Sequence, residues 1–207
     1  MILKKLQTIS FLILMTGVVF SCASVKPIPI DQNSSRPGTQ VDFRGKPFKL
    51  IGSPLSVGAS LPSVNLVDAM TMNDVDLSKE KGFVLLLSIV PSLDTPVCEQ
   101  QTHDLAEKGK SLPNGIKRIV ISRDTPFAQK RFAKEAKLMD LQYLSDYKEG
   151  AFGRSTGLLM EGLMLLARSV IVVDKKGVVQ YIQVVPEITH LPEMEKAVQK
   201  AAELSKE

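Results

Sequence analysis

Phe83-Val-Leu-Leu-Leu-Ser-Ile-Val-Pro-Ser-Leu-Asp-Thr-Pro-Val-Cys98 is the stretch on which the fold of this chain depends. Its first eight residues are almost entirely apolar, which is typical of a strand covered on both faces of a sheet. Pro91 ends that strand, and Pro96 suits the first turn of a helix with Thr95 as its N-cap. Cys98 therefore lies at a strand-to-helix junction, where free backbone N–H groups and the helix dipole favour a thiolate. Most free cysteines are buried and inert, so the rest of the sequence must decide between packing and chemistry.

Strands and helices alternate along the rest of the chain. The order predicts an α/β fold, with a central mixed sheet flanked by helices, an N-terminal β-hairpin, and the reactive group just past the central strand. The predicted elements, in chain order, are a hairpin at 41–52, strands at 64–68 and 70–77, the central strand at 83–90, a helix at 96–110, a strand at 116–122, a helix at 124–137, a strand at 141–144, a brief helix at 149–156, a hairpin at 169–185 and a helix at 190–204.

The N-terminus carries the pattern of an export signal. Lys4 and Lys5 precede an apolar segment at 6–20 that is short for a bilayer span, and small residues flank Cys22. This resembles a bacterial lipoprotein signal peptide, whose last motif ends in the cysteine that becomes acylated. A plain secretory signal and a weak membrane anchor are the alternatives. The resulting division is a signal peptide at 1–21, a flexible tether at 22–41 that is rich in proline and serine, and one domain at 42–207. We therefore expect an exported protein on the periplasmic side, anchored to the membrane through lipid on Cys22.

Charge and cysteine usage narrow the function. The 26 basic and 22 acidic residues form no basic block, so nothing indicates a nucleic-acid surface. The chain has two cysteines, and acylation of Cys22 leaves Cys98 as the single thiol. An exported protein gains no disulfide from a lone thiol, which favours a chemical role for Cys98. There is no Cys-x-x-Cys, His-Glu-x-x-His or P-loop pattern, so no metal or cofactor is expected.

The segment Pro91-Ser-Leu-Asp-Thr-Pro-Val-Cys98 is similar to the peroxidatic-cysteine motif of peroxiredoxins, in the form used by bacterial thiol peroxidases. The resemblance covers about residues 42–205 and implies a thioredoxin-like fold of the peroxiredoxin variant, peroxide as substrate, and a homodimer. Further segments that resemble the subfamily occur in the expected order, at Phe48–Gly52, Ile121–Phe132, Ser145–Asp146, Phe152–Gly153, Leu165–Asp174 and Val185–Thr189.

The same resemblance implies four site residues. Cys98 is the nucleophile that attacks hydrogen peroxide or an organic hydroperoxide, and Arg168 stabilises the thiolate and binds substrate oxygens. The Thr95 hydroxyl hydrogen-bonds the thiolate and the peroxide, and Pro91 shapes the loop and shields the sulfur. Taken singly, Thr95 is an ordinary cap, Pro91 a strand terminator and Arg168 a solvated charge at a strand edge. Their joint spacing around one cysteine favours the site.

One departure from the subfamily changes the expected cycle. Ala133 stands where the subfamily carries its resolving cysteine, and Thr156 departs from the familiar Phe-Gly-x-x-Tyr-Gly. A sulfenic acid on Cys98 must then be reduced by an external thiol, from a thioredoxin-like protein or a small molecule, or by Cys98 of another subunit, or stay open to overoxidation.

Two other function classes are compatible with the fold. A catalytically silent lipoprotein could keep the domain as a binding module, although the retained Thr95, Cys98 and Arg168 argue against it. An extracytoplasmic thiol–disulfide oxidoreductase lacks its Cys-x-x-Cys. His103 is expected to be exposed or capping, His190 structural, and the apolar run 158–166 to lie in the core or at a dimer interface.

Overall fold

The apolar run forms β5 (Val84–Ile89), an interior strand of a seven-stranded mixed sheet. The structure is a computed structural model that describes residues 27–207, so the predicted signal peptide and Cys22 lie outside the described residues. No helix within that range is long and apolar enough to span a membrane. The remaining elements are β1 (Gln40–Phe43), β2 (Lys46–Ile51), β3 (Asn65–Asp68), β4 (Asp74–Asp76), α1 (Pro96–Lys108), β6 (Ile116–Ser122), α2 (Pro126–Glu135), β7 (Gln142–Ser145), α3 (Ala151–Thr156), β8 (Leu159–Met160), β9 (Ser169–Val173), β10 (Val179–Val184) and α4 (Met194–Leu204), with 3-10 turns at Leu77–Lys79 and Gly109–Ser111.

The large sheet has the strand order β10-β9-β5-β6-β7-β3-β4. Its centre is parallel, since β5 pairs with β6 and β6 with β7 in the same direction. The hairpin of β9 and β10 joins one edge of this core antiparallel, and β3 and β4 extend the other edge antiparallel. The mixed α/β sheet predicted from the sequence is therefore confirmed.

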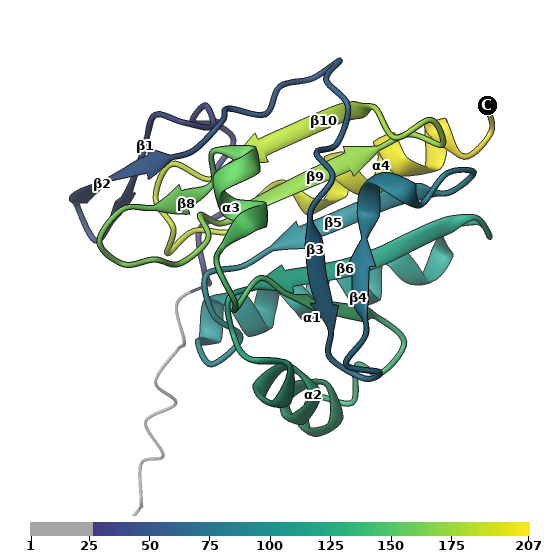
Figure 1. Cartoon of the computed structure of the whole chain (residues 1–207), viewed down its shortest axis with the longest axis horizontal. Helices are drawn as coiled ribbons and strands as arrows, with labels where there is room; N and C mark the ends of the chain where they lie inside the picture. The colour runs from purple at the N-terminus through teal and green to yellow at the C-terminus, as the bar shows by residue number, and fades with distance from the viewer. Residues whose placement is uncertain (1–26) are drawn as a thin grey trace, which may run out of the picture.

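Side chains of β5 alternate between two buried layers. Leu85, Leu87 and Ile89 pack into one apolar cluster, whereas Val84 and Leu86 pack into a second cluster on the opposite face. The second cluster contains side chains from α1, α2 and α4, which cover that face of the sheet (Figure 1). The first cluster contains side chains from α3 and the small sheet. A strand buried on both faces explains why the sequence shows a continuous apolar run instead of alternation.

A second, three-stranded sheet has the order β1-β2-β8. Its β1–β2 hairpin is the N-terminal hairpin expected from the sequence, with Val41 opposite Phe48. The two-residue strand β8, which pairs Met160 with Leu50, lies in the run 158–166 and was not predicted as a strand. Leu159 and Met160 are buried in the core, while Leu163 and Met164 are partly exposed.

The tether predicted at 22–41 is wrong for its described part. Residues 27–39, here called the N-terminal strap, run along β10 and the segment that follows it. Asp31 N–H donates to the Leu191 carbonyl at 2.8 Å, and Ser35 N–H donates to the Val184 carbonyl at 2.8 Å. The buried Gln183 amide adds bonds to the carbonyls of Asp31 (2.8 Å) and Asn33 (3.1 Å). The strap's prolines and serines mimic a linker because backbone groups, not an apolar period, hold it in place.

Replacing Gln183 with alanine is expected to loosen the strap. The side chain also accepts from Glu193 N–H, so three backbone groups lose a partner, which costs about 1–3 kcal/mol of unfolding free energy. Urea unfolding measures that loss, and limited proteolysis should cut the variant faster within 27–39. Q180A is the matched control, because the Gln180 amide on the same strand bonds Asp174. Equal cleavage of Q183A and the unmodified protein would show that backbone pairing alone holds the strap.

Candidate active site

Cys98 is the third residue of α1, which begins directly after the loop that ends β5. Thr95 is the N-cap residue and Pro96 the first helical residue, as the sequence predicted. The Cys98 side chain has no exposed surface and packs in the same apolar cluster as Val90 and Leu93. The amides of a first helical turn have no intrahelical acceptor, so the sulfur lies at the positive end of the helix dipole.

Arg168 lies immediately before β9 and is 2% exposed. Its Nη2 donates to Cys98 Sγ at 3.3 Å, although the two residues are 70 positions apart. Its Nη1 donates to Gln101 Oε1 at 2.7 Å and more weakly to the Val97 carbonyl at 3.5 Å. Its Nε donates to the Ile188 carbonyl at 2.7 Å. Bonds from three of its nitrogens fix the plane of the guanidinium, and the structure brings the predicted pair Cys98 and Arg168 together.

No carboxylate lies within ion-pair distance of Arg168 among residues 27–207. Its partners are two backbone carbonyls, an amide oxygen and a sulfur. Burying a guanidinium costs several kcal/mol unless an opposite charge compensates. The group at Sγ is the one neighbour that can become an anion, so the surroundings of Arg168 stabilise a negative charge on the sulfur.

Gln101 is a site residue that the sequence analysis missed. It lies three positions after Cys98 on the same face of α1, and its side chain is fully buried. Its amide nitrogen donates to Ser88 Oγ at 2.8 Å and lies 3.3 Å from the carbonyls of Ile89 and Ser169, while its oxygen accepts from Arg168. Gln101 thus ties the guanidinium to β5 and β9. The available signal was a polar side chain on the buried face of a helix.

Asp124 was expected to begin a helix, but its carboxylate holds the loop before Cys98. Ser92 Oγ donates to Asp124 Oδ1 at 2.7 Å, and Leu93 N–H donates to Asp124 Oδ2 at 2.8 Å. Ser122 Oγ donates to the same carboxylate at 2.7 Å, which anchors it to the end of β6. Pro91 is buried at the start of this loop. The loops that follow the neighbouring parallel strands β5 and β6 are therefore joined at the carboxyl ends of those strands.

Thr95 does not make the side-chain contacts predicted for it. Its backbone has the extended conformation of an N-cap, but its hydroxyl makes no capping bond. It is exposed, and Oγ1 donates to the Ser92 carbonyl at 3.1 Å instead of to Cys98. Pro96, as the first helical residue, removes one of the unpaired N–H groups of the first turn.

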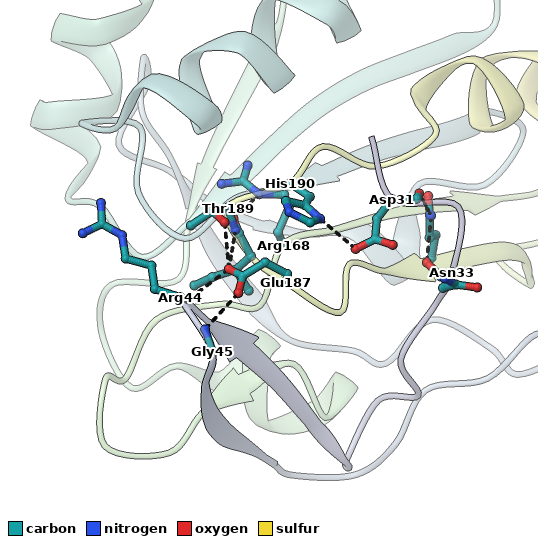
Figure 2. Close-up of polar contacts among 10 residues, drawn as sticks. Asp31, Asn33, Arg44, Gly45, Arg168, Glu187, Thr189 and His190 are labelled. Carbon is teal, nitrogen blue, oxygen red and sulfur yellow. Dashed lines mark hydrogen bonds and ion pairs between the residues drawn. The ribbon is translucent and has the colours of Figure 1, made fainter. Parts of the chain in front are cut away.

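Ala133 and the predicted histidines occupy different surroundings. Ala133 of α2 has no exposed surface and belongs to the same apolar cluster as Cys98. A nearby open cavity of about 360 Å³ is lined by the N-terminus of α1 and by α2, at Leu93–Pro96, Glu99, Phe132, Glu135 and Ala136. His103 lies 3.9 Å from Glu99 on the outer side of α1. His190 Nδ1 lies 3.2 Å from Asp31 Oδ2, at the strap (Figure 2).

The comparisons with known proteins identify the family of this chain. The family model described as Redoxin matches residues 56–198. The thiol peroxidase of Halalkalibacterium halodurans is 38% identical over 161 residues, which cover 78% of this chain and 96% of the relative. The thiol peroxidase of Staphylococcus saprophyticus is 41% identical over 160 residues, covering 77% and 96%. The chain belongs to the Redoxin family, in its bacterial thiol peroxidase group.

Solved structures support the fold. A peroxiredoxin-like protein from Aquifex aeolicus has a TM-score of 0.76 and 34% identity, covering 83% of this chain and 99% of that one. A thiol peroxidase from Chromobacterium violaceum shares the fold with a TM-score of 0.70 at 23% identity, covering 79% and 97%. The resemblance and the thioredoxin-like fold inferred from the sequence are confirmed.

Removing the Asp124 carboxylate is expected to open the loop over Cys98. D124A loses three hydrogen bonds, so the free energy that keeps the loop closed should fall by about 1–3 kcal/mol. Alkylation of Cys98 by iodoacetamide should then accelerate by roughly 10-fold or more. D140A is the control, because Asp140 pairs with Arg118 at the surface. Unchanged alkylation in D124A would mean that other contacts close the loop.

Proposed function

We propose that this protein is a thiol-dependent peroxidase that reduces hydrogen peroxide and organic hydroperoxides at Cys98. The observation that carries the proposal is the buried Arg168 guanidinium with Nη2 3.3 Å from Sγ and no carboxylate to neutralise it within the described chain. The thiolate attacks one peroxide oxygen, the O–O bond breaks, and the other oxygen leaves as water or alcohol after taking up a proton. Cys98 becomes a sulfenic acid, oxidised by two electrons.

Arg168 interacts with both the thiolate and the peroxide in this step. Its charge stabilises the thiolate, and its N–H groups are placed to donate to a peroxide oxygen bound beside the sulfur. Pro91, which is buried at the start of the loop, closes the site against bulk water. Thr95 is close in sequence, and its hydroxyl reaches a peroxide if it turns away from the Ser92 carbonyl that it bonds here.

The second half of the cycle is proposed to use an external thiol. Attack of that thiol on the sulfenic acid forms a mixed disulfide and releases water, and a second thiol then returns Cys98 to the thiol form. Ala133 supplies no sulfur at the position of the subfamily's resolving cysteine. Because Sγ is fully buried, a reducing thiol reaches it only after the first turn of α1 or the Asp124-held loop moves.

Mass spectrometry of Cys98 tests the proposal in a C22S background, where it is the only thiol. One equivalent of peroxide should add about 16 Da within seconds, trapped as a sulfenic acid by dimedone. Turnover should occur only with added thiol, and R168M should react at least about 10-fold more slowly because a nearby cation contributes a few kcal/mol. C98S is the control for non-specific oxidation. A Cys98 that reacts no faster than free cysteine would overturn the proposal.

Export and lipid anchoring through Cys22 are also proposed, on the signal-like pattern of residues 1–21. The described, packed domain already begins at Pro27. Five residue steps from Cys22 to Pro27 reach at most about 18 Å, so a lipidated protein would hold its strap close to the membrane surface. Pairing as a homodimer is proposed as well, supported by exposed apolar side chains such as Phe127, which is 72% exposed on α2.

Metabolic labelling tests the anchor. Cells expressing the full chain with a labelled fatty acid should give a labelled, detergent-phase protein on the periplasmic side. C22S should lose the label and leave the detergent phase, whereas C98S should keep both. Label on C22S would contradict acylation at Cys22.

A further inference from the structure

The Arg168 side chain depends on a segment far from the cysteine loop. Residues 185–191, which follow β10, bond Arg168 twice: Val185 N–H donates to the Arg168 carbonyl at 2.9 Å, and the Ile188 carbonyl accepts from Nε at 2.7 Å. The Nε bond is as short as the bond from Nη1 to Gln101. The direction of the Ile188 carbonyl therefore helps to set where Nη2 lies relative to Sγ.

The Ile188 carbonyl belongs to a peptide group whose other end is held by Glu187. In a trans peptide, the carbonyl of residue 188 and the N–H of residue 189 lie in one rigid plane and point in opposite directions. Thr189 N–H donates to Glu187 Oε1 at 3.1 Å, and Thr189 Oγ1 donates to the same oxygen at 2.8 Å. The carboxylate thus holds one end of the plane while Arg168 holds the other (Figure 2).

The carboxylate is itself fixed from a second direction by the turn between β1 and β2. Arg44 N–H lies 3.2 Å from Oε1, and Gly45 N–H lies 3.3 Å from Oε2. Both turn residues have positive φ, 53° and 77°, as two-residue hairpin turns require. Burial alone raises the pKa of Glu187, but the hydrogen bonds from Thr189, Arg44 and Gly45 outweigh it and hold the pKa of this carboxyl below its usual value. Glu187 is therefore an anion at neutral pH.

We propose that Glu187 is a positioning residue of the peroxidase reaction, which orients Arg168 through the peptide group between Ile188 and Thr189. The inference rests on the proposed function. The chain of contacts runs from an anion, through one polarised peptide, to the buried cation and the sulfur, and each bond strengthens the next. The Ile188 N–H is held independently by the Asp42 carbonyl at 2.9 Å, so the backbone at Ile188 keeps this anchor when the Glu187 carboxylate is removed.

Three variants at this position separate orientation from charge. E187A removes every acceptor, so the Ile188–Thr189 peptide and Arg168 are free to shift, and the peroxide rate constant of Cys98 should fall about 10- to 100-fold. E187Q keeps an oxygen at the Oε1 position, which carries three of the four contacts, and should stay within about 3-fold of the unmodified protein. E187D moves the carboxylate oxygens back by one methylene, so its peroxide rate constant should lie between those of E187A and E187Q. This variant keeps the test usable if E187A does not fold.

The matched control is D76A. The Asp76 carboxylate also accepts from a backbone N–H and from hydroxyls, at Ser78 N (3.0 Å), Ser78 Oγ (2.7 Å) and Ser63 Oγ (2.7 Å), but it lies on the edge strand β4. The D76A variant should lose stability in urea as E187A does, but its peroxide rate constant should equal that of the unmodified protein. The second readout is the rate of Cys98 alkylation by iodoacetamide against pH, whose midpoint should move to higher pH in E187A and stay in place in D76A.

The outcomes divide cleanly. A slower E187A, a rescued E187Q and an unchanged D76A support the positioning role. An E187A that reacts as fast as the unmodified protein, or an E187Q as slow as E187A, overturns it. If unmodified Cys98 shows no peroxidase reaction, the proposed function fails. The alkylation profiles then still decide whether Glu187 acts on the pair of Arg168 and Cys98.

Discussion

The structure of the candidate active site depends on a buried cation placed against a thiol. Arg168 is 2% exposed and is surrounded by neutral acceptors, so its desolvation is incompletely offset until the sulfur becomes an anion. Reactivity and stability are therefore linked through one contact. The guanidinium is placed to stabilise a negative charge on the sulfur, in a site closed to water.

The sheet supplies the rigidity that this contact needs. Alternation along β5 directs Ser88 toward α1, where its hydroxyl accepts from the Gln101 amide, and Gln101 then holds the guanidinium. Arg168 directly precedes β9, which runs antiparallel to β5. The start of β9 therefore lies beside the end of β5, and this places the arginine near the cysteine that follows β5. The third support comes from the β1–β2 hairpin through Glu187. Three separate elements therefore converge on one side chain, and a shift in any of them moves its donors relative to the sulfur.

The parts of this arrangement that follow a local pattern were predictable from the sequence. The apolar run of β5, the prolines at 91 and 96, and the hairpins each have a local cause. The pairing of Cys98 with Arg168 came from the family resemblance, because no periodicity links residues 70 positions apart. Gln101, Asp124 and Glu187 act through side-chain hydrogen bonds to residues of distant segments, and such bonds leave no spacing signal. The strap was misinterpreted for a similar reason, since its backbone is held by the main-chain carbonyls of Val184 and Leu191 and by the Gln183 side-chain amide.

A closed site of this kind sets two demands that oppose each other. A peroxide is small, but a reducing thiol must bring its sulfur to about 2 Å from Sγ, and Sγ has no exposed surface. Either the loop held by Asp124 or the first turn of α1 must therefore move before a reducing thiol can reach the sulfur. Ala133 has no thiol, so a sulfenic acid on Cys98 cannot be reduced from that position and the reducing thiol must come from outside the domain. In the proposed cycle, tighter contacts around Arg168 would favour oxidation, whereas looser contacts around Asp124 would favour reduction. The contacts around Arg168 come from α1 and the segment after β10, whereas those of Asp124 come from the ends of β5 and β6, so the two sets can be altered separately.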